Sequence, residues 1–358
     1  MPSAEEEVWR YSRIADLDLA RYAPSTEALS VSVELPASWA DAGATLERGP
    51  AASADAAGDP DVFVTLNRDH AADQVTVRVP RGAQLAEPLE VGVHVAGEAL
   101  AAFPRLVVEV GEGASATVLE RTTSTDDDLL TVPRTELRVA RGGRLAFATV
   151  QDLGARAWQI GSLVAEVAQE GNLEVSLVGL GGEYARMRTD CILAGRGANG
   201  DLSAAYFGDG DQTLDFRTFQ EHAAPDTTSN LLFKGAVGGR SRSVYTGLIR
   251  VDKDARGTSA FQTNRNVKLS DEAWAESVPN LEIETNDVRC SHASTVGPVD
   301  PEQRFYLESR GVPPTVADRL IVAGFFDEVV RGLPTDALVA DVRARIAAKL
   351  DQVAEDLR

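Results

Sequence analysis

The chain has 358 residues, 44% of them hydrophobic, and a formal net charge of −20. This length allows one large domain or two ordinary ones with a sizeable core. The negative charge argues against unaided binding to nucleic acid or to an anionic membrane surface.

The N-terminal sequence and the cysteine content indicate the compartment. MPSAEEEVWRYSR is acidic and lacks the basic-then-apolar pattern of a signal peptide. No apolar run approaches the roughly 20 residues that a membrane span needs. The two cysteines, Cys191 and Cys290, are too few for a disulfide framework. We therefore expect a reduced, cytoplasmic protein.

The first two regions of the chain differ in composition and in hydrophobic pattern. Residues 1–55 are rich in alanine and acidic residues, which predicts an irregular N-terminal segment with a short helix near residues 5–11. Residues 56–299 carry short alternating runs between turn residues, which predict strands. The runs include VFVTLN, QVTVRVP, LEVGVHV, RLVVEV, LAFATV and LEVSLV. No long helical pattern interrupts them, so this region is not a chain of βαβ units.

Turn glycines in the β region recur on one period. Gly113, Gly143, Gly171 and Gly200 are separated by steps of 30, 28 and 29 residues, and Gly257 follows after 57, twice that step. A fixed period of this size predicts a β-helix, or solenoid, in which each strand pairs with the next turn and inward side chains stack in columns. An irregular β-sandwich with coincidental glycine spacing is the alternative.

Residues 300–358 predict a helical domain. Asp300, Pro301 and Gln303 form the N-cap, first-turn proline and capping-box positions of a short helix that Gly311 would end. A more apolar helix follows over residues 315–331, and it packs either on its own protein or on a partner. The last helix carries one apolar stripe, formed by Leu338, Val342, Ile346, Leu350, Val353 and Leu357.

Two motif matches have plain structural interpretations. GRGANG, residues 195–200, matches the dinucleotide pattern G-x-G-x-x-G, but a strand-like sequence follows it where a helix is required. FGDGDQTLD brings Asp209, Asp211 and Asp215 close in sequence, and a solvated loop is favoured over a calcium site. No P-loop pattern occurs.

The histidines and cysteines are the remaining candidates for chemistry. We expect His70, His94 and His222 to be structural and Cys191 to be buried. Cys290 and His292 lie two apart in one predicted strand and therefore share a face. Two ligands cannot close a tetrahedral metal site, so a metal site here needs ligands from another chain.

Counting from the turn residues assigns this pair to two columns. The first column, which is mostly apolar and predicts packing for Cys290, is Thr117, Phe147, Val175, Ala204, Leu232, Phe261 and Cys290. The second, more mixed column is Leu119, Thr149, Leu177, Tyr206, Lys234, Thr263 and His292. His292 is therefore the preferred functional residue.

Long stretches of the sequence resemble the SufB/SufD family of iron–sulfur cluster assembly proteins. The family's core signature is similar to EHAAPDTTSNLLFKGAVGGRSRSVYTGLIRV at residues 221–251, and PNLEIETNDVRCSHASTVG continues it in order. RFYLESRGVPPTVADRLIVAGFFDEVV is similar to the family's C-terminal helical segment. The resemblance implies a right-handed parallel β-helix flanked by N-terminal and C-terminal helical segments. It is strongest to SufD, because Ala293 replaces the glutamate that follows the histidine in SufB.

The resemblance also implies a function and partners. SufB and SufD form a heterodimer, and each recruits SufC, an ABC-type ATPase, which would explain the lack of a P-loop here. A SufD-type subunit is not an enzyme. His292 matches the histidine implicated at the SufB–SufD interface, so it would bind iron or an iron–sulfur cluster transiently, with Cys290 a weaker candidate. Residues implied for ATPase docking are Phe305, Tyr306, Leu320, Phe325 and Phe326.

Two other functions remain open at this point. The first is a structural homodimer that pairs through the open edges of its terminal turns, because an exposed β edge needs covering. The second is a β-helix carbohydrate-active enzyme, which would use stacked carboxylates. Such enzymes are usually secreted, and the N-terminal sequence argues against export.

Overall fold

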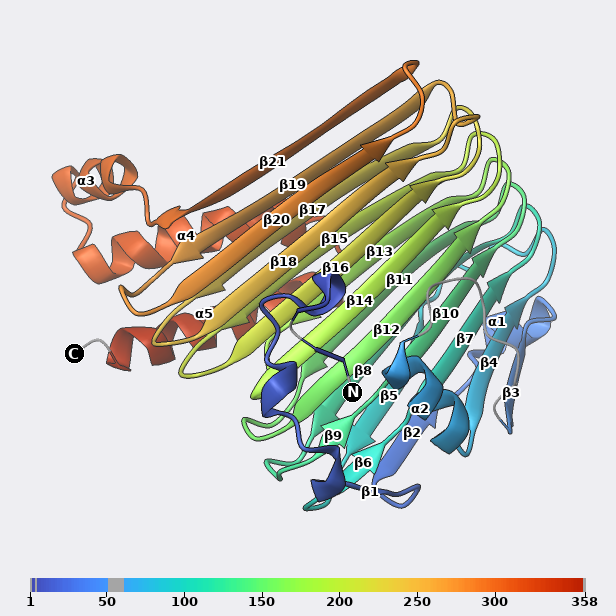
Figure 1. Cartoon of the computed structure of the whole chain (residues 1–358), viewed down its shortest axis with the longest axis horizontal. Helices are drawn as coiled ribbons and strands as arrows, with labels where there is room; N and C mark the ends of the chain where they lie inside the picture. The colour runs from blue at the N-terminus through green and yellow to red at the C-terminus, as the bar shows by residue number, and fades with distance from the viewer. Residues whose placement is uncertain (1, 4, 51–60, 357–358) are drawn as a thin grey trace.

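Two β-sheets run along the body of the molecule (Figure 1). The structure, a computed structural model, describes residues 2, 3, 5–50 and 61–356. One sheet has twelve strands: β1 (Ala23–Pro24), β3 (Thr45–Gly49), β4 (Gln74–Val79), β6 (Leu100–Ala102), β7 (Arg105–Val110), β9 (Leu130–Thr131), β10 (Arg134–Val139), β12 (Trp158–Val167), β14 (Tyr184–Leu193), β16 (Thr213–His222), β18 (Arg242–Val251) and β20 (Trp274–Ile283). The other has nine: β2 (Leu29–Val33), β5 (Leu89–Val95), β8 (Ser115–Ser124), β11 (Arg144–Asp152), β13 (Asn172–Gly179), β15 (Asn199–Gly208), β17 (Thr228–Val237), β19 (Thr258–Lys268) and β21 (Val288–Pro298).

The chain winds between the two sheets as a solenoid. From β10 onward successive strands alternate between the sheets, and each pairs in parallel with the strand one turn away. In the described part of the first turn, β2 and β3 pair antiparallel with β5 and β4, and the short strands β6 and β9 join the twelve-stranded sheet beside β1 and β12. The prediction of a parallel β-solenoid is confirmed, with about eight turns.

The turns are unequal in length. Residues paired across β8, β11, β13, β15 and β17 lie 29, 28, 27 and 29 residues apart, and the steps to β19 and β21 are 31 and 30. A glycine keeps one tight corner, since a Cβ at Gly195 would collide with the backbone of Gln169 in the preceding turn. The G-x-G-x-x-G match is therefore a solenoid corner that leads into β15, as predicted.

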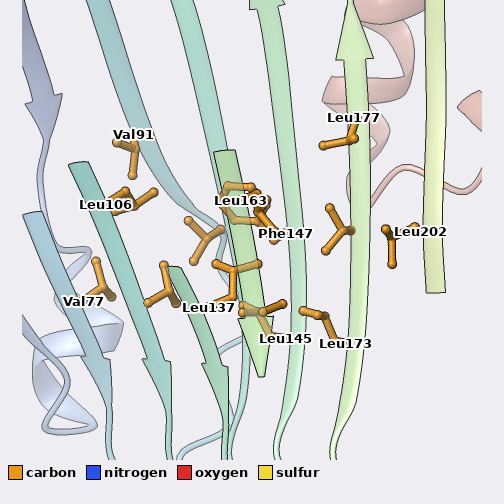
Figure 2. Close-up of a cluster of buried hydrophobic side chains, with 14 of the residues drawn as sticks. Val77, Val91, Leu106, Leu137, Leu145, Phe147, Leu163, Leu173, Leu177 and Leu202 are labelled. Atoms are coloured by element: carbon orange, nitrogen blue, oxygen red, sulfur yellow. The ribbon is translucent and has the colours of Figure 1, made fainter. Parts of the chain in front are cut away.

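Apolar side chains from both sheets fill the lumen of the solenoid. Val77, Leu106 and Leu163 come from the twelve-stranded sheet and meet Phe147 and Leu173 of the nine-stranded sheet (Figure 2). Alternation along each strand sends every second residue inward, as in the burial pattern of β5. Full burial of a leucine or phenylalanine side chain contributes about 1.5–3 kcal/mol, so stacked columns of them account for much of the stability.

The N-terminal segment and α2 (Val62–His70) cover the outer face of the twelve-stranded sheet (Figure 1). The covering part of the segment holds three 3-10 turns, Glu7–Trp9, Ile14–Asp16 and Leu19–Arg21, whereas α1 (Ala37–Asp41) lies between β2 and β3 and packs Trp39 into the lumen cluster. The prediction of a strand for VFVTLN is wrong, because these residues form most of α2. The Asp61 carboxylate caps this helix by accepting from the backbone N–H groups of Phe63 and Val64. Asn67 then ties it to the sheet by donating to Pro104 O and Val132 O.

Three helices follow the last strand: α3 (Pro301–Ser309), α4 (Pro314–Val330) and α5 (Asp336–Asp356). The Asp300 side chain caps α3, and Gly311 follows its end with φ +85°, as the sequence predicts. α4 and α5 pack on the outer face of the nine-stranded sheet through one apolar cluster that includes the predicted stripe of α5 up to Val353. Leu357 lies outside the described residues. No described helix is long and apolar enough to span a membrane.

Candidate functional site

The last turn of the solenoid, β20 and β21, forms an open end. Within the described residues each of these strands pairs with only one neighbour, β18 or β19, so its other edge is free. Several apolar side chains remain exposed on these strands: Trp274, Ile283 and Val296. Free strand edges beside exposed apolar groups are typical of a surface that pairs with another chain.

Cys290 and His292 lie on the inward face of β21 at this open end. They pair with Ala260 and Gln262 of β19, which are both buried in the lumen. Paired residues in a parallel sheet point to the same side, so Cys290 and His292 continue the inward columns. His292 is exposed and Cys290 is half-buried, because no further described turn covers them.

The register corrects the predicted columns. His292, not Cys290, stands at the end of the apolar column, whose buried members are Val118, Phe147, Val175, Leu202, Leu231 and Gln262. Cys290 lines up with smaller residues in the turns nearest to it: Ala260, Ser229 and Gly200. The predicted columns are wrong because the turn residues from which they were counted do not occupy equivalent positions in turns of 27 to 31 residues.

The Cys290 thiol is held in its protonated form. It packs against an apolar cluster that contains Ile249, Val251 and Ala260. Burial raises the pKa of Cys290, and a backbone hydrogen bond at Ala260 only partly opposes this. Since the thiolate is the form that binds metals and attacks electrophiles, Cys290 is poorly prepared for either task in this structure.

His292 supplies one nitrogen donor and cannot make a site alone. Among the described residues no group of three or more His, Cys, Asp or Glu side chains could hold a metal ion. An imidazole at an open strand edge can instead join donors that another chain brings to the same edge. A metal site that includes His292 would therefore need donors from another chain.

In the loop with three aspartates, which the sequence predicts to be solvated and not a calcium site, each carboxylate has its own cationic partner. Asp209 pairs with Lys349 at 3.0 Å and Asp211 with Arg240. Asp215 is buried on the outer face of the twelve-stranded sheet. Burial opposes its ionisation, but the guanidinium groups beside it hold the pKa of Asp215 below its usual range. The three carboxylates serve separate ion pairs. The solvated-loop prediction is confirmed for the exposed Asp211 and is wrong for Asp215, which is buried in β16.

The remaining histidines and Cys191 lie away from the open end. His70 and His94 are exposed, and the His70 ring lies 5.2 Å from the Phe103 ring in a tilted arrangement. His222 is buried, with ring nitrogens 2.8 and 2.9 Å from hydroxyl oxygens of Thr227 and Ser229, and burial lowers its pKa to about 4. Cys191 is fully buried, as predicted, and burial raises its pKa to about 12.

The residues predicted for partner docking divide into two groups. Phe305, Tyr306 and Leu320 are 73%, 58% and 52% exposed. Phe326 is only 2% exposed and stacks on Phe207 of β15. Phe325 is partly buried, and its backbone carbonyl accepts a hydrogen bond from Lys234 Nζ at 2.8 Å. The first group faces solvent, and the second holds α4 on the solenoid.

Sequence reasoning missed Gln262. This residue is 1% exposed, lies beside His292 in the ladder, and has a side-chain amide with no hydrogen-bond partner among the described residues. A polar residue in a predicted strand gives no signal of its own. Only the register shows that Gln262 interrupts an apolar column directly beneath His292.

The comparisons with known proteins all match one family. The model of the SUF system FeS cluster assembly, SufBD core domain, matches residues 93–325. An iron–sulfur cluster assembly SufBD family protein of Mycobacterium tuberculosis is 33% identical over 370 residues, covering 99% of this chain and 90% of that protein. The iron–sulfur cluster assembly protein SufD of Escherichia coli is 31% identical over 295 residues, covering 81% of this chain and 70% of that protein.

Proposed function

Because the chain belongs to the SufBD family of iron–sulfur cluster assembly proteins, we propose that it is the SufD-type, non-catalytic subunit of a SufB–SufC–SufD scaffold. It supports iron acquisition and cluster formation and catalyses no reaction of its own. The similarity to SufD of Escherichia coli supports this assignment. So does Ala293, at a position where SufB carries a glutamate.

The observation that carries the proposal is the exposed His292 imidazole at the open end of the solenoid. A SufB-type subunit pairs with this end, covers the free strand edges and brings its own thiolate or carboxylate donors. His292 then adds a nitrogen donor, a combination that iron accepts. Iron or the growing cluster is the cargo of this junction and leaves once it is complete.

The exposed residues of α3 and α4 form the docking surface for a SufC-type ATPase. Phe305, Tyr306 and Leu320 supply the apolar contacts, since large exposed aromatic groups are typical anchors at interfaces. α3 begins at Pro301, directly after β21 ends at Pro298. Movement of a docked ATPase is therefore transmitted to the strand that carries His292, which can open or close the shared site.

Replacement of His292 by alanine tests the site. We expect His292→Ala to form the complex with both partners but to lower cluster-enzyme activity in cells that depend on this scaffold. His94→Ala is the matched control, because His94 is exposed on β5 in the first turns. Unchanged cluster-enzyme activity in His292→Ala would refute the site assignment. A pulldown with the ATPase and the SufB-type subunit monitors complex formation.

A structural homodimer is the second candidate, and the free edges of β20 and β21 favour it. Two copies of this chain could cover each other's open ends without binding a cluster. The two candidates differ in mass and in metal content of the purified assembly.

A further inference from the structure

Gln262 occupies an unusual position at the floor of the open end. It lies on β19, one turn below His292, and is 1% exposed. Both Nε2 and Oε1 of its amide lack a hydrogen-bond partner among the described residues. Buried amides almost always have partners, so an amide that lacks both donor and acceptor contacts needs an explanation.

The amide group reaches across the lumen toward the opposite sheet. A Cβ at Gly247 of β18 would collide with Gln262 Nε2 and with Tyr245 Oη, so the missing side chain at Gly247 is what makes room for the amide. Tyr245 Oη itself lies 3.0 Å from Thr218 Oγ1 and already has a partner. The Gln262 amide is therefore a polar group at the bottom of the open end, and neither its N–H groups nor its oxygen has a hydrogen-bond partner among the described residues.

The column that contains Gln262 argues against a packing role. Its buried members in the five preceding turns are all apolar: Val118, Phe147, Val175, Leu202 and Leu231. An apolar side chain at position 262 would continue this column without burying a polar group. The change to glutamine occurs only in the layer next to His292.

We propose that Gln262 is a positioning residue for His292. When a SufB-type partner closes the open end, Gln262 Oε1 accepts a hydrogen bond from one ring N–H of His292, which directs the other ring nitrogen at the shared metal. Neighbouring strands are about 4.8 Å apart, within reach of a glutamine side chain. This inference rests on the proposed function, because it assumes that His292 binds the cargo metal.

Two physical arguments support this pairing. In the free chain the His292 ring is exposed and hydrated, so it gains little from Gln262. Once a partner covers the open end, the Gln262 amide and the His292 ring both lose water. Leaving either of them unpaired then costs free energy, which a hydrogen bond between them recovers. Metal-binding histidines also generally donate their second ring N–H to an oxygen acceptor, which fixes the tautomer and the ring orientation.

The test uses the purified complex of this chain with its SufB-type partner and ATPase, titrated with Co²⁺ and followed by visible absorption. Gln262→Met removes the acceptor, and we expect Co²⁺ affinity to fall 10- to 100-fold. Gln262→Glu keeps an acceptor oxygen and should retain affinity near that of the native complex. Leu231→Met, one layer deeper in the same column, is the matched control and should bind Co²⁺ normally.

Thermal stability separates positioning from packing. Gln262→Met replaces an unpartnered buried amide by an apolar group, so its Tm should equal or exceed that of the native chain while its metal affinity falls. A lowered Tm, or a complex that no longer assembles, would show a structural role and overturn the proposal.

The controls also separate this proposal from the proposed function. Normal Co²⁺ affinity in Gln262→Met, with weakened affinity in His292→Ala, overturns the positioning role and leaves the proposed function standing. A water molecule that alone satisfies Gln262 would give this result. Normal affinity in His292→Ala refutes the metal site and the positioning role together.

Discussion

The Glu120 carboxyl group lies inside the solenoid, far from the open end. It is 8% exposed and faces a cavity of about 30 Å³ between the two sheets. Thr149 and Gln151 of β11, Gln159 of β12, and Arg186, which is already paired with Asp215, also line this cavity. Burial raises the pKa of Glu120 from its usual 4.5 to about 7, against a hydrogen bond with Thr149 that lowers it. The folded chain therefore holds the proton more tightly than the unfolded chain does.

This pKa shift predicts a stability that depends on pH. Below about pH 4.5 the carboxyl group is protonated in both states and costs nothing. Between pH 4.5 and 7 only the unfolded chain releases the proton, so the free energy of unfolding falls as pH rises, by about 3 kcal/mol in total. Above pH 7 this loss is complete. We expect Glu120→Gln to remove this slope and to stabilise the chain at pH 8.

Urea denaturation between pH 4 and 8 measures the effect. Glu90→Gln is a suitable control, because Glu90 is exposed on β5 and its replacement should leave the slope of the native chain intact. A Glu120→Gln variant that keeps the native slope would show that another group causes the pH dependence.

At the scale of elements, α4 depends on a few contacts with the nine-stranded sheet. Phe326 stacks on Phe207, with ring centroids 6.2 Å apart. Lys234 is 3% exposed beneath the helix, donates to Phe325 O and pairs with Glu328. A lysine buried under a helix is tolerated because its ammonium group donates a hydrogen bond to a carbonyl and pairs with a carboxylate. α4 is thus part of the solenoid's cover, and it also carries Leu320 of the proposed docking surface.

Phe326 and Phe305 should give opposite results when each is replaced by alanine. Phe326→Ala opens a cavity and should cost about 3–5 kcal/mol, which loosens α4 and α5 from the sheet. Phe305→Ala removes an exposed ring, so stability should persist while ATPase binding weakens. Hydrogen exchange of the α4 amides and a pulldown with the ATPase measure the two effects. Native-like protection of α4 in Phe326→Ala would contradict the anchoring role.

The sequence predicts the ends of an element correctly where capping residues within that element mark them. α3 begins after Asp300 and ends before Gly311, as expected, since a cap acts within one helical turn. VFVTLN fails because a short apolar run fits a strand or a helix equally well. The choice depends on the Asp61 cap and on the outer face of the sheet that α2 covers.

At the scale of the whole molecule, the period of the turns can be read from the glycines, but the register cannot. The turns are 27 to 31 residues long, so a fixed offset from each turn residue does not give equivalent positions in the ladder. That His292 and Cys290 share a face could be predicted from their strand, because residues two apart point to the same side. Its alignment with Gln262 could not, since that needs the 30-residue step between β19 and β21, whereas the turn residues Gly257 and Asn286 lie 29 apart.

The open end also sets how whole chains assemble. Free edges of β20 and β21 favour pairing, but two copies of a chain with a net charge of −20 repel each other. We therefore expect the isolated chain to self-associate weakly, and more strongly when salt screens the charges. Sedimentation at several salt concentrations measures this, and association that weakens with salt would contradict it.

One substitution at the open end should abolish pairing of either kind. Val296 points inward on β21 and is 41% exposed, so Val296→Lys places a charge where a partner strand must pack. We expect the variant to remain monomeric and to lose the SufB-type subunit in a pulldown. Val62→Lys, at the 36% exposed start of α2, adds the same charge away from the open end and should pair normally. If Val296→Lys still pairs as well as Val62→Lys, the free edges of β20 and β21 are not the interface.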